Sequence, residues 1–159
     1  MSKILKTIAV GLLAAAPLVS MATPLMGDFD KSLIEQGVIG ADYKYKNPEQ
    51  AAKVFAALEA QINASLPTEA INGIQSTSVA FTPYKSTYVH SYTVEFDKAK
   101  IPELKKQIGS PVILSKLCNE IFLAEKFLAA NNHRMTFRYQ QKNGQKIADV
   151  QMNNAVCIA

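Results

Sequence analysis

Several features that accompany catalysis or cofactor binding are absent from this sequence. It has no Gly-x-Gly-x-x-Gly fingerprint and no P-loop, and its seven glycines are scattered. No serine lies in a Gly-x-Ser-x-Gly elbow, and the two histidines, His90 and His133, do not form a His-x-x-x-His pair. The sequence therefore predicts no catalytic residues, no metal site and no cofactor.

The sequence also lacks any block of like charge. The chain has 17 basic and 13 acidic residues, a net charge of +4, and the two signs are interspersed. A nucleic-acid-binding protein is expected to carry a clustered basic stripe, and a peripheral membrane protein a polybasic segment. Neither is present, so we expect no nucleic-acid partner.

The N-terminus has the three parts of a secretory signal. Lys3 and Lys6 precede residues 7–19, which are uncharged and mostly apolar, and the small-x-small triplet Ser20-Met21-Ala22 follows. This apolar run is shorter than the roughly 20 residues that span a bilayer. We therefore predict a signal peptide over residues 1–22 cleaved after Ala22, a single domain over residues 23–159, and no stable membrane anchor after cleavage.

Two cysteines remain after this cleavage. Cys118 and Cys157 are too far apart for a Cys-x-x-Cys redox motif. An even number of cysteines in an exported protein indicates a disulfide. The sequence therefore predicts a structural Cys118–Cys157 bond and a periplasmic or secreted location.

The first half of the chain predicts a short helix over residues 28–36, a short strand over residues 42–46, and then a long helix. Asn47 is suited to the N-cap of that helix and Pro48 to its first turn. An apolar stripe at spacings of three and four follows and ends at Pro67. Residues 76–81 and 87–96 then alternate as two strands of a hairpin.

The second half repeats this order. Ser110-Pro111 has the same cap-plus-proline start, and the pattern predicts a continuous helix over residues 111–131. A second hairpin follows, with Asn143-Gly144 at its turn. We expect an α+β fold in which an antiparallel sheet of two hairpins packs against two main helices, in the order helix, hairpin, helix, hairpin.

Two features of the helix over residues 111–131 concern function. Glu125 falls on its apolar face, where an unpaired carboxylate is unfavourable, so we predict a buried ion pair with Arg134 or Arg138. Leu123 and Phe127 fall on its polar side. They form an exposed patch that binds a partner, unless another element, such as the helix over residues 28–36, covers them.

The two histidines are the candidates for a catalytic base. We interpret His90 as a packed, hydrogen-bonded core residue of a strand, and His133 as a capping or exposed residue of a turn. The alternative function is a small hydrolase that uses one of them. A third possibility is a carrier of a small apolar ligand, which requires an apolar cavity between sheet and helices.

Residues 111–158 combine Leu117-Cys118 in a helix, a basic-aromatic strand from Arg134 to Tyr139, an Asn-Gly turn and a strand leading to Cys157. This pattern resembles small exported bacterial two-cysteine domains, namely type II secretion pilotins and a family of quorum-sensing-regulated virulence factors. Pilotins are typically lipoproteins, whereas this chain has no lipobox cysteine. The resemblance implies a non-enzymatic protein of the bacterial cell envelope that binds another protein as an accessory factor, inhibitor or virulence factor.

Overall fold

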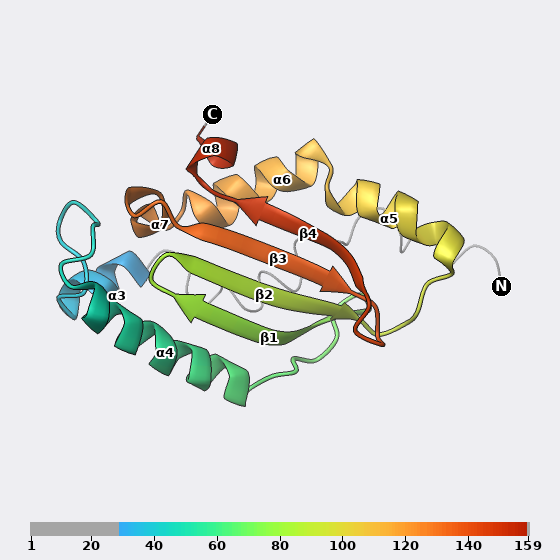
Figure 1. Ribbon diagram of the computed structural model, residues 1–159, viewed down its shortest axis with the longest axis horizontal. Helices are drawn as coiled ribbons and strands as arrows, with labels where there is room; N and C mark the ends of the chain where they lie inside the picture. Colours follow the sequence, from blue (N-terminus) through green and yellow to red (C-terminus); the bar gives the residue numbers. More distant parts are fainter. Residues whose placement is uncertain (1–28, 159) are drawn as a thin grey trace.

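The computed structural model describes residues 29–158, and two β-hairpins form its single sheet. The first hairpin is β1 (Ile74–Thr82) with β2 (Lys85–Tyr92), and the second is β3 (Arg134–Gln140) with β4 (Lys146–Met152). The strand order is β1-β2-β3-β4 (Figure 1). The predicted signal peptide and its cleavage site lie outside the described residues.

The two hairpins meet through a parallel pair of strands. β2 and β3 pair in parallel, with Lys85 opposite Arg134 and Tyr88 opposite Phe137. The sheet is therefore mixed and not wholly antiparallel as predicted. The reason is the connection: the segment between β2 and β3 is a helical crossover, which returns the chain to the starting end of β2.

The helices lie along the two edges of the sheet (Figure 1). α4 (Pro48–Ala64) packs against β1, whereas α5 (Ile101–Ile108) and α6 (Pro111–Leu117) pack against β4. The remaining helical elements are shorter: α3 (Phe29–Glu35), the 3₁₀ turn η1 (Lys98–Lys100), the π-helical η2 (Cys118–Phe122), α7 (Lys126–Ala130) and α8 (Asn154–Cys157). The order helix, hairpin, helix, hairpin is confirmed.

The two faces of the sheet differ because side chains alternate along each strand. Tyr88 and His90 of β2 and Phe137 and Tyr139 of β3 are buried in the core. The residues between them, Val89 and Arg138, point to the other face and are half-buried. β2 ends at Tyr92 and not at Phe96, and the predicted strand over residues 42–46 is reduced to one isolated bridge, between Ile39 and Tyr45.

The predicted helix starts and turns are confirmed. The Asn47 side chain accepts hydrogen bonds from the amides of Glu49 and Gln50, and Ser110 accepts one from Ile113. Gly144, at the turn of the second hairpin, has a φ of +84°, which favours glycine. Local chemistry therefore specifies these boundaries correctly.

The predicted continuous helix over residues 111–131 is wrong. It consists of α6, η2 and α7, and Glu125 adopts an extended conformation immediately before α7. Asp30, distant in sequence, supplies the missing cap: its carboxylate accepts from the amides of Lys126, at 2.8 Å, and Phe127, at 3.1 Å. Because α3 provides this acceptor, a second helix start becomes favourable in the middle of a helix-forming sequence.

The outer edge of β1 is covered by polar side chains. The Asn63 amide bonds to both the carbonyl and the amide of Val79, and Glu59 accepts a hydrogen bond from the amide of Phe81. An uncovered edge strand would invite pairing with another chain. Asn63, which also begins the sequence Asn-Ala-Ser, therefore has a structural role that joins α4 to the sheet.

Candidate functional site

The predicted partner surface at Leu123 and Phe127 does not form. Phe127 is only 3% exposed, and its ring lies 5.5 Å from Phe29 and 6.0 Å from Phe55. Leu123 remains 38% exposed. The alternative interpretation, coverage by the helix over residues 28–36, is correct for Phe127, because α3 covers it. Phe127 therefore does not form an exposed patch with Leu123.

The predicted Glu125–Arg138 ion pair is absent from the described part of the chain. Glu125 is buried and accepts a hydrogen bond from the amide of Asp30 at 3.2 Å. Arg138 instead pairs with Asp149 of β4, through Nε to Oδ1 at 3.0 Å and Nη2 to Oδ2 at 3.2 Å. Arg138 points to the opposite face of the sheet from the core, and for this reason it cannot serve the buried carboxylate.

Both histidines are structural. His90 Nδ1 lies 3.0 Å from Ser76 Oγ, and its ring stacks on Phe137. His133 is buried too, contrary to the expectation of a capping or exposed residue. Its Nδ1 lies 3.1 Å from the Pro83 carbonyl oxygen and its Nε2 lies 3.0 Å from Ser86 Oγ. Burial lowers the pKa of each histidine to about 4.

These two histidines are expected to make the stability depend on pH. Their folded-state pKa values lie below the ordinary 6.5, so the unfolded chain binds more protons between about pH 4 and 6.5. Stability is therefore greatest above that window and falls as the pH drops through it, by on the order of 1–3 kcal/mol for each histidine. Urea-denaturation midpoints at several pH values measure this slope.

The variant His133→Gln tests how much His133 contributes to this dependence of stability on pH. It removes one titrating ring and is expected to make the slope between pH 6.5 and pH 4 shallower. Asp149, whose pKa is lowered mainly by its hydrogen bond with Arg138, loses its stabilising charge only below that window. An unchanged slope in the variant would show that His133 does not drive the acid sensitivity.

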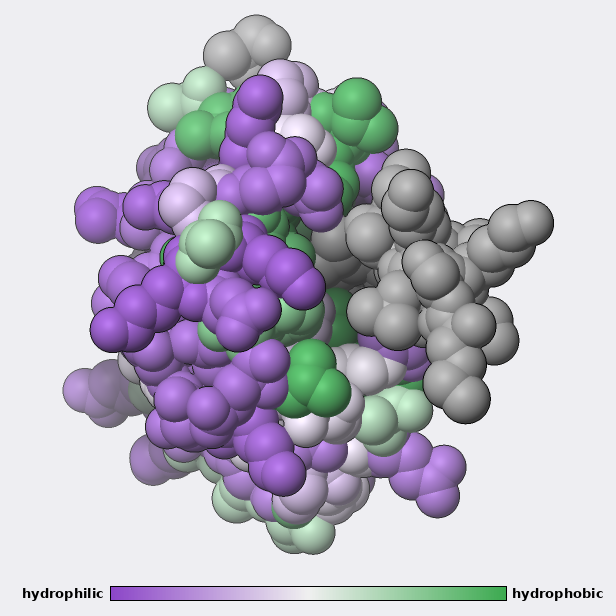
Figure 2. Space-filling view, turned by 90° about the vertical axis from the view of Figure 1, so that its right-hand side faces the viewer, coloured by the Kyte–Doolittle hydropathy of each residue, from purple (hydrophilic) through white to green (hydrophobic). Residues whose placement is uncertain are grey.

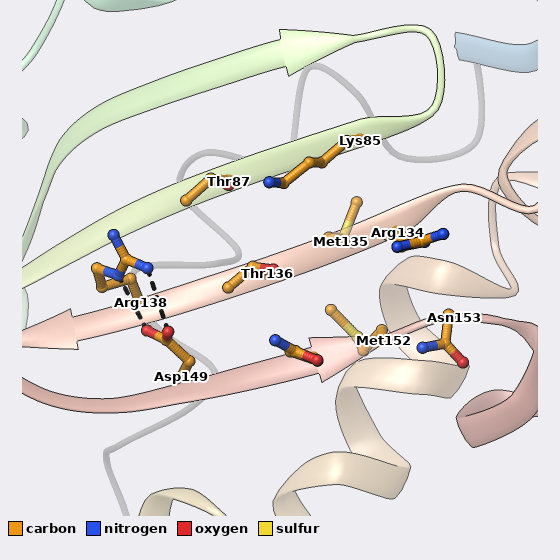
Figure 3. A pocket seen from close by; sticks show the side chains of 10 residues that line it. Lys85, Thr87, Arg134, Met135, Thr136, Arg138, Asp149, Met152 and Asn153 are labelled. Carbon is orange, nitrogen blue, oxygen red and sulfur yellow. Dashed lines mark hydrogen bonds and ion pairs between the residues drawn. The ribbon is translucent and has the colours of Figure 1, made fainter.

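The face of the sheet away from the core carries a depression of about 230 Å³ (Figure 3). Side chains from β2, β3, β4 and the residue after β4 surround it: Lys85, Thr87, Arg134, Met135, Thr136, Arg138, Asp149, Gln151, Met152 and Asn153. We call this surface the open face. In Figure 2, the left-hand part of the molecule, which lies toward the viewer of Figure 1, is mainly hydrophilic.

The charges of the open face are unequally distributed. Asp149 pairs with Arg138, and Lys146 Nζ lies 3.6 Å from Asp149 Oδ2. The Arg138 hydrogen bond and charge lower the pKa of Asp149, and Asp149 raises the pKa of Arg138. Lys85 and Arg134, side by side at the start of β2 and β3, have no acidic partner in the described part of the structure.

Sequence reasoning did not identify this face. The alternation of Arg134, Thr136 and Arg138 with apolar residues places these three on one side of β3, which is visible in the sequence. Their proximity to Lys85 and Thr87 depends on the parallel register of β2 and β3, which the sequence pattern does not reveal. Long-range strand pairing is set by tertiary packing and not by local alternation.

The described residues contain no group of three His, Cys, Asp or Glu side chains that could hold a metal ion. Among residues 29–158, no helix combines the length and apolar character needed to cross a membrane. The predicted Cys118–Cys157 disulfide is confirmed, with a Cα–Cα distance of 5.3 Å.

No protein-family model matches this sequence, and no curated protein is similar to it in sequence. Two solved structures are similar to it at low sequence identity. One is PA3611 of Pseudomonas aeruginosa, which is assigned as a secreted protein: TM-score 0.51, 12% identity, 69% of this chain and 95% of that chain. The other is the pilotin EpsS of the Vibrio vulnificus type 2 secretion system: TM-score 0.45, 14% identity, 69% of this chain and 94% of that chain. At this identity, the similarity to PA3611 shows a common fold.

Proposed function

We propose that this chain is a non-enzymatic protein of the bacterial cell envelope, periplasmic or secreted, that binds another protein through its open face. The observation that carries the proposal is the arrangement of charge there. Lys85 and Arg134 are adjacent, exposed and without an acidic partner among the described residues. Such cations are available to a partner, because no internal ion pair has to be broken first.

The disulfide supports the export part of the proposal. Bonds of this kind persist in oxidising compartments such as the periplasm and the extracellular medium. The Cys118–Cys157 bond agrees with the signal peptide predicted over residues 1–22. The accessory, inhibitory or virulence role implied by the family resemblance belongs to the same proposal.

The two alternative functions lack support at the depression. A hydrolase of the expected kind requires a histidine beside a nucleophile in a concave site. Neither a histidine nor a serine or cysteine lines the depression, and both histidines are 1% exposed. A carrier of an apolar ligand requires a mostly apolar cavity, whereas the lining of this depression is mainly charged and polar.

Photocrosslinking in the intact envelope tests the proposal. A crosslinking amino acid at the exposed Gln151 position of the open face is expected to trap a defined protein, identified by mass spectrometry. The matched control has the same amino acid at Lys53, exposed on α4. Crosslinks from Lys53 alone would indicate that the partner binds at the helices and not at the open face. The absence of crosslinks from both positions would contradict the proposed binding function.

A further inference from the structure

We infer that the open face binds an extended segment of a protein partner that is rich in aspartate and glutamate. This inference rests on the proposed function and specifies the chemistry of the partner. The depression is lined by three cationic side chains, Lys85, Arg134 and Arg138, and by one acid, Asp149. The excess of positive charge favours an acidic ligand.

The spacing of the cations favours an extended chain over a single small anion. Arg134 and Arg138 are four residues apart on β3, which corresponds to about 13 Å along a strand. Lys85 lies opposite Arg134 on the neighbouring strand, roughly 5 Å across the sheet. Lys85 and Arg134 are close enough to share one anion, but Arg138 is too far away to join them. All three can meet successive carboxylates of an extended peptide.

Hydroxyl groups fill the space between the cations. Thr87 and Thr136 lie opposite each other on β2 and β3, between the Lys85–Arg134 pair and Arg138 (Figure 3). Threonine hydroxyls both donate and accept hydrogen bonds. They can therefore accept hydrogen bonds from N–H donors of a peptide between its acidic residues, which lysine and arginine side chains, being donors only, cannot do.

Asp149 makes the two ends of the open face differ in charge. Its carboxylate holds Arg138 through two hydrogen bonds and attracts Lys146, so the three charges at this end sum to +1. The other end, at Lys85 and Arg134, keeps its charge. The acidic residues of the partner are therefore expected to concentrate over Lys85 and Arg134 and to avoid Asp149.

Tyr84 lies in the turn before the charged end, with its ring 5.4 Å from that of Tyr45 and outside the lining of the depression. Tyr84, 49% exposed in the turn before Lys85, accepts a hydrogen bond through its carbonyl oxygen from the amide of Arg134, so the turn and the start of β3 are joined. An anionic membrane fits less well, because the most exposed apolar side chains, Val112 and Ile158, belong to α6 and the C-terminal segment and do not line this face.

The test measures the binding of a labelled peptide of about twelve residues that alternates glutamate and threonine. The protein is exported as the full chain and purified from the periplasm with its disulfide intact. Fluorescence anisotropy is expected to show binding that weakens between about 50 mM and about 300 mM salt. A peptide with glutamine in place of glutamate is expected not to bind.

Charge reversal locates the site. Lys85→Glu with Arg134→Glu is expected to weaken binding by about tenfold or more. Lys53→Glu with Lys105→Glu makes the same change in net charge on α4 and α5 and is expected to change binding less than about twofold. Circular dichroism checks folding, and Lys85→Gln with Arg134→Gln provides a milder pair if the reversed variant does not fold.

Three results would overturn the inference: equal weakening by both charge-reversed proteins, tight binding of inorganic phosphate at the same site, or binding of anionic phosphatidylglycerol vesicles in preference to the peptide. Failure of this inference is distinguishable from failure of the proposed function. If the glutamate peptide does not bind while a crosslinker at Gln151 still traps a protein, the open face binds a partner, as the proposed function states, but that partner segment is not acidic.

Discussion

Replacement of Phe127 by alanine is expected to lower the free energy of unfolding by about 3–5 kcal/mol. The ring is 3% exposed and contacts Phe29 of α3, Phe55 of α4 and Tyr45. Its removal leaves a cavity where two helices from the N-terminal part of the chain meet α7. Because those helices are held by other contacts, the cavity cannot close fully. Urea denaturation of the purified protein measures the loss.

The matched control is Leu123→Ala. Leu123 precedes Phe127 by one helical turn in the sequence but is 38% exposed, so its truncation is expected to lower the free energy of unfolding by less than about 1 kcal/mol. Comparable losses in the two variants would contradict the interior position of Phe127. If Phe127→Ala abolished partner binding without lowering the stability, Phe127 would instead be an exposed residue that contacts the partner, as the sequence suggests.

Removal of the disulfide has the second large expected effect. Cys118 and Cys157 are 39 positions apart. In the chain-entropy treatment, a cross-link that closes a loop of this length raises the free energy of the unfolded chain by about 4 kcal/mol, because the chain loses conformational entropy. The double variant Cys118→Ala with Cys157→Ala is expected to lose about 2–4 kcal/mol. Urea denaturation of the oxidised and variant proteins gives the difference.

The bond also has a local effect in the folded state. It ties the four-residue helix α8, which follows the edge strand β4, to the π-helical segment η2. Hydrogen exchange of the β4 amides is therefore expected to accelerate in the double variant. A reducing agent provides the control: it should destabilise the natural chain and leave the double variant unchanged. Equal stability of the oxidised and reduced natural protein would contradict a structural role for the disulfide.

Much of the secondary structure is predictable because its signals are local. Asn47 and Ser110 cap the helices that they precede, and Gly144 adopts the positive φ of the second hairpin turn. The alternation of polar and apolar residues along β3 is sufficient to separate Arg134, Thr136 and Arg138 from the core. These features depend on residues within a few positions of one another.

The errors share one physical origin, contacts between residues far apart in the sequence. The helix over residues 111–131 has a continuous apolar face, but Asp30 caps the amides of Lys126 and Phe127 and so starts α7 within it. Arg138 and Glu125 are both plausible ion-pair partners by sequence, yet strand alternation and the β3–β4 register direct Arg138 to Asp149. The Asp30 cap has no local signal, and the direction of Arg138, which strand alternation indicates, leads to Asp149 only through the β3–β4 register.

The sequence by itself determined the α+β class, the order of helices and hairpins, the disulfide and the assignment of Arg134 and Arg138 to one side of β3, because periodicity, caps and turns act over short distances. The tertiary structure alone decided that the central strands run parallel, that α3 buries Phe127, and that Lys85 lies beside Arg134. The open face exists through this pairing, since charges 49 positions apart in the chain become neighbours only when the helical crossover brings β3 back beside β2.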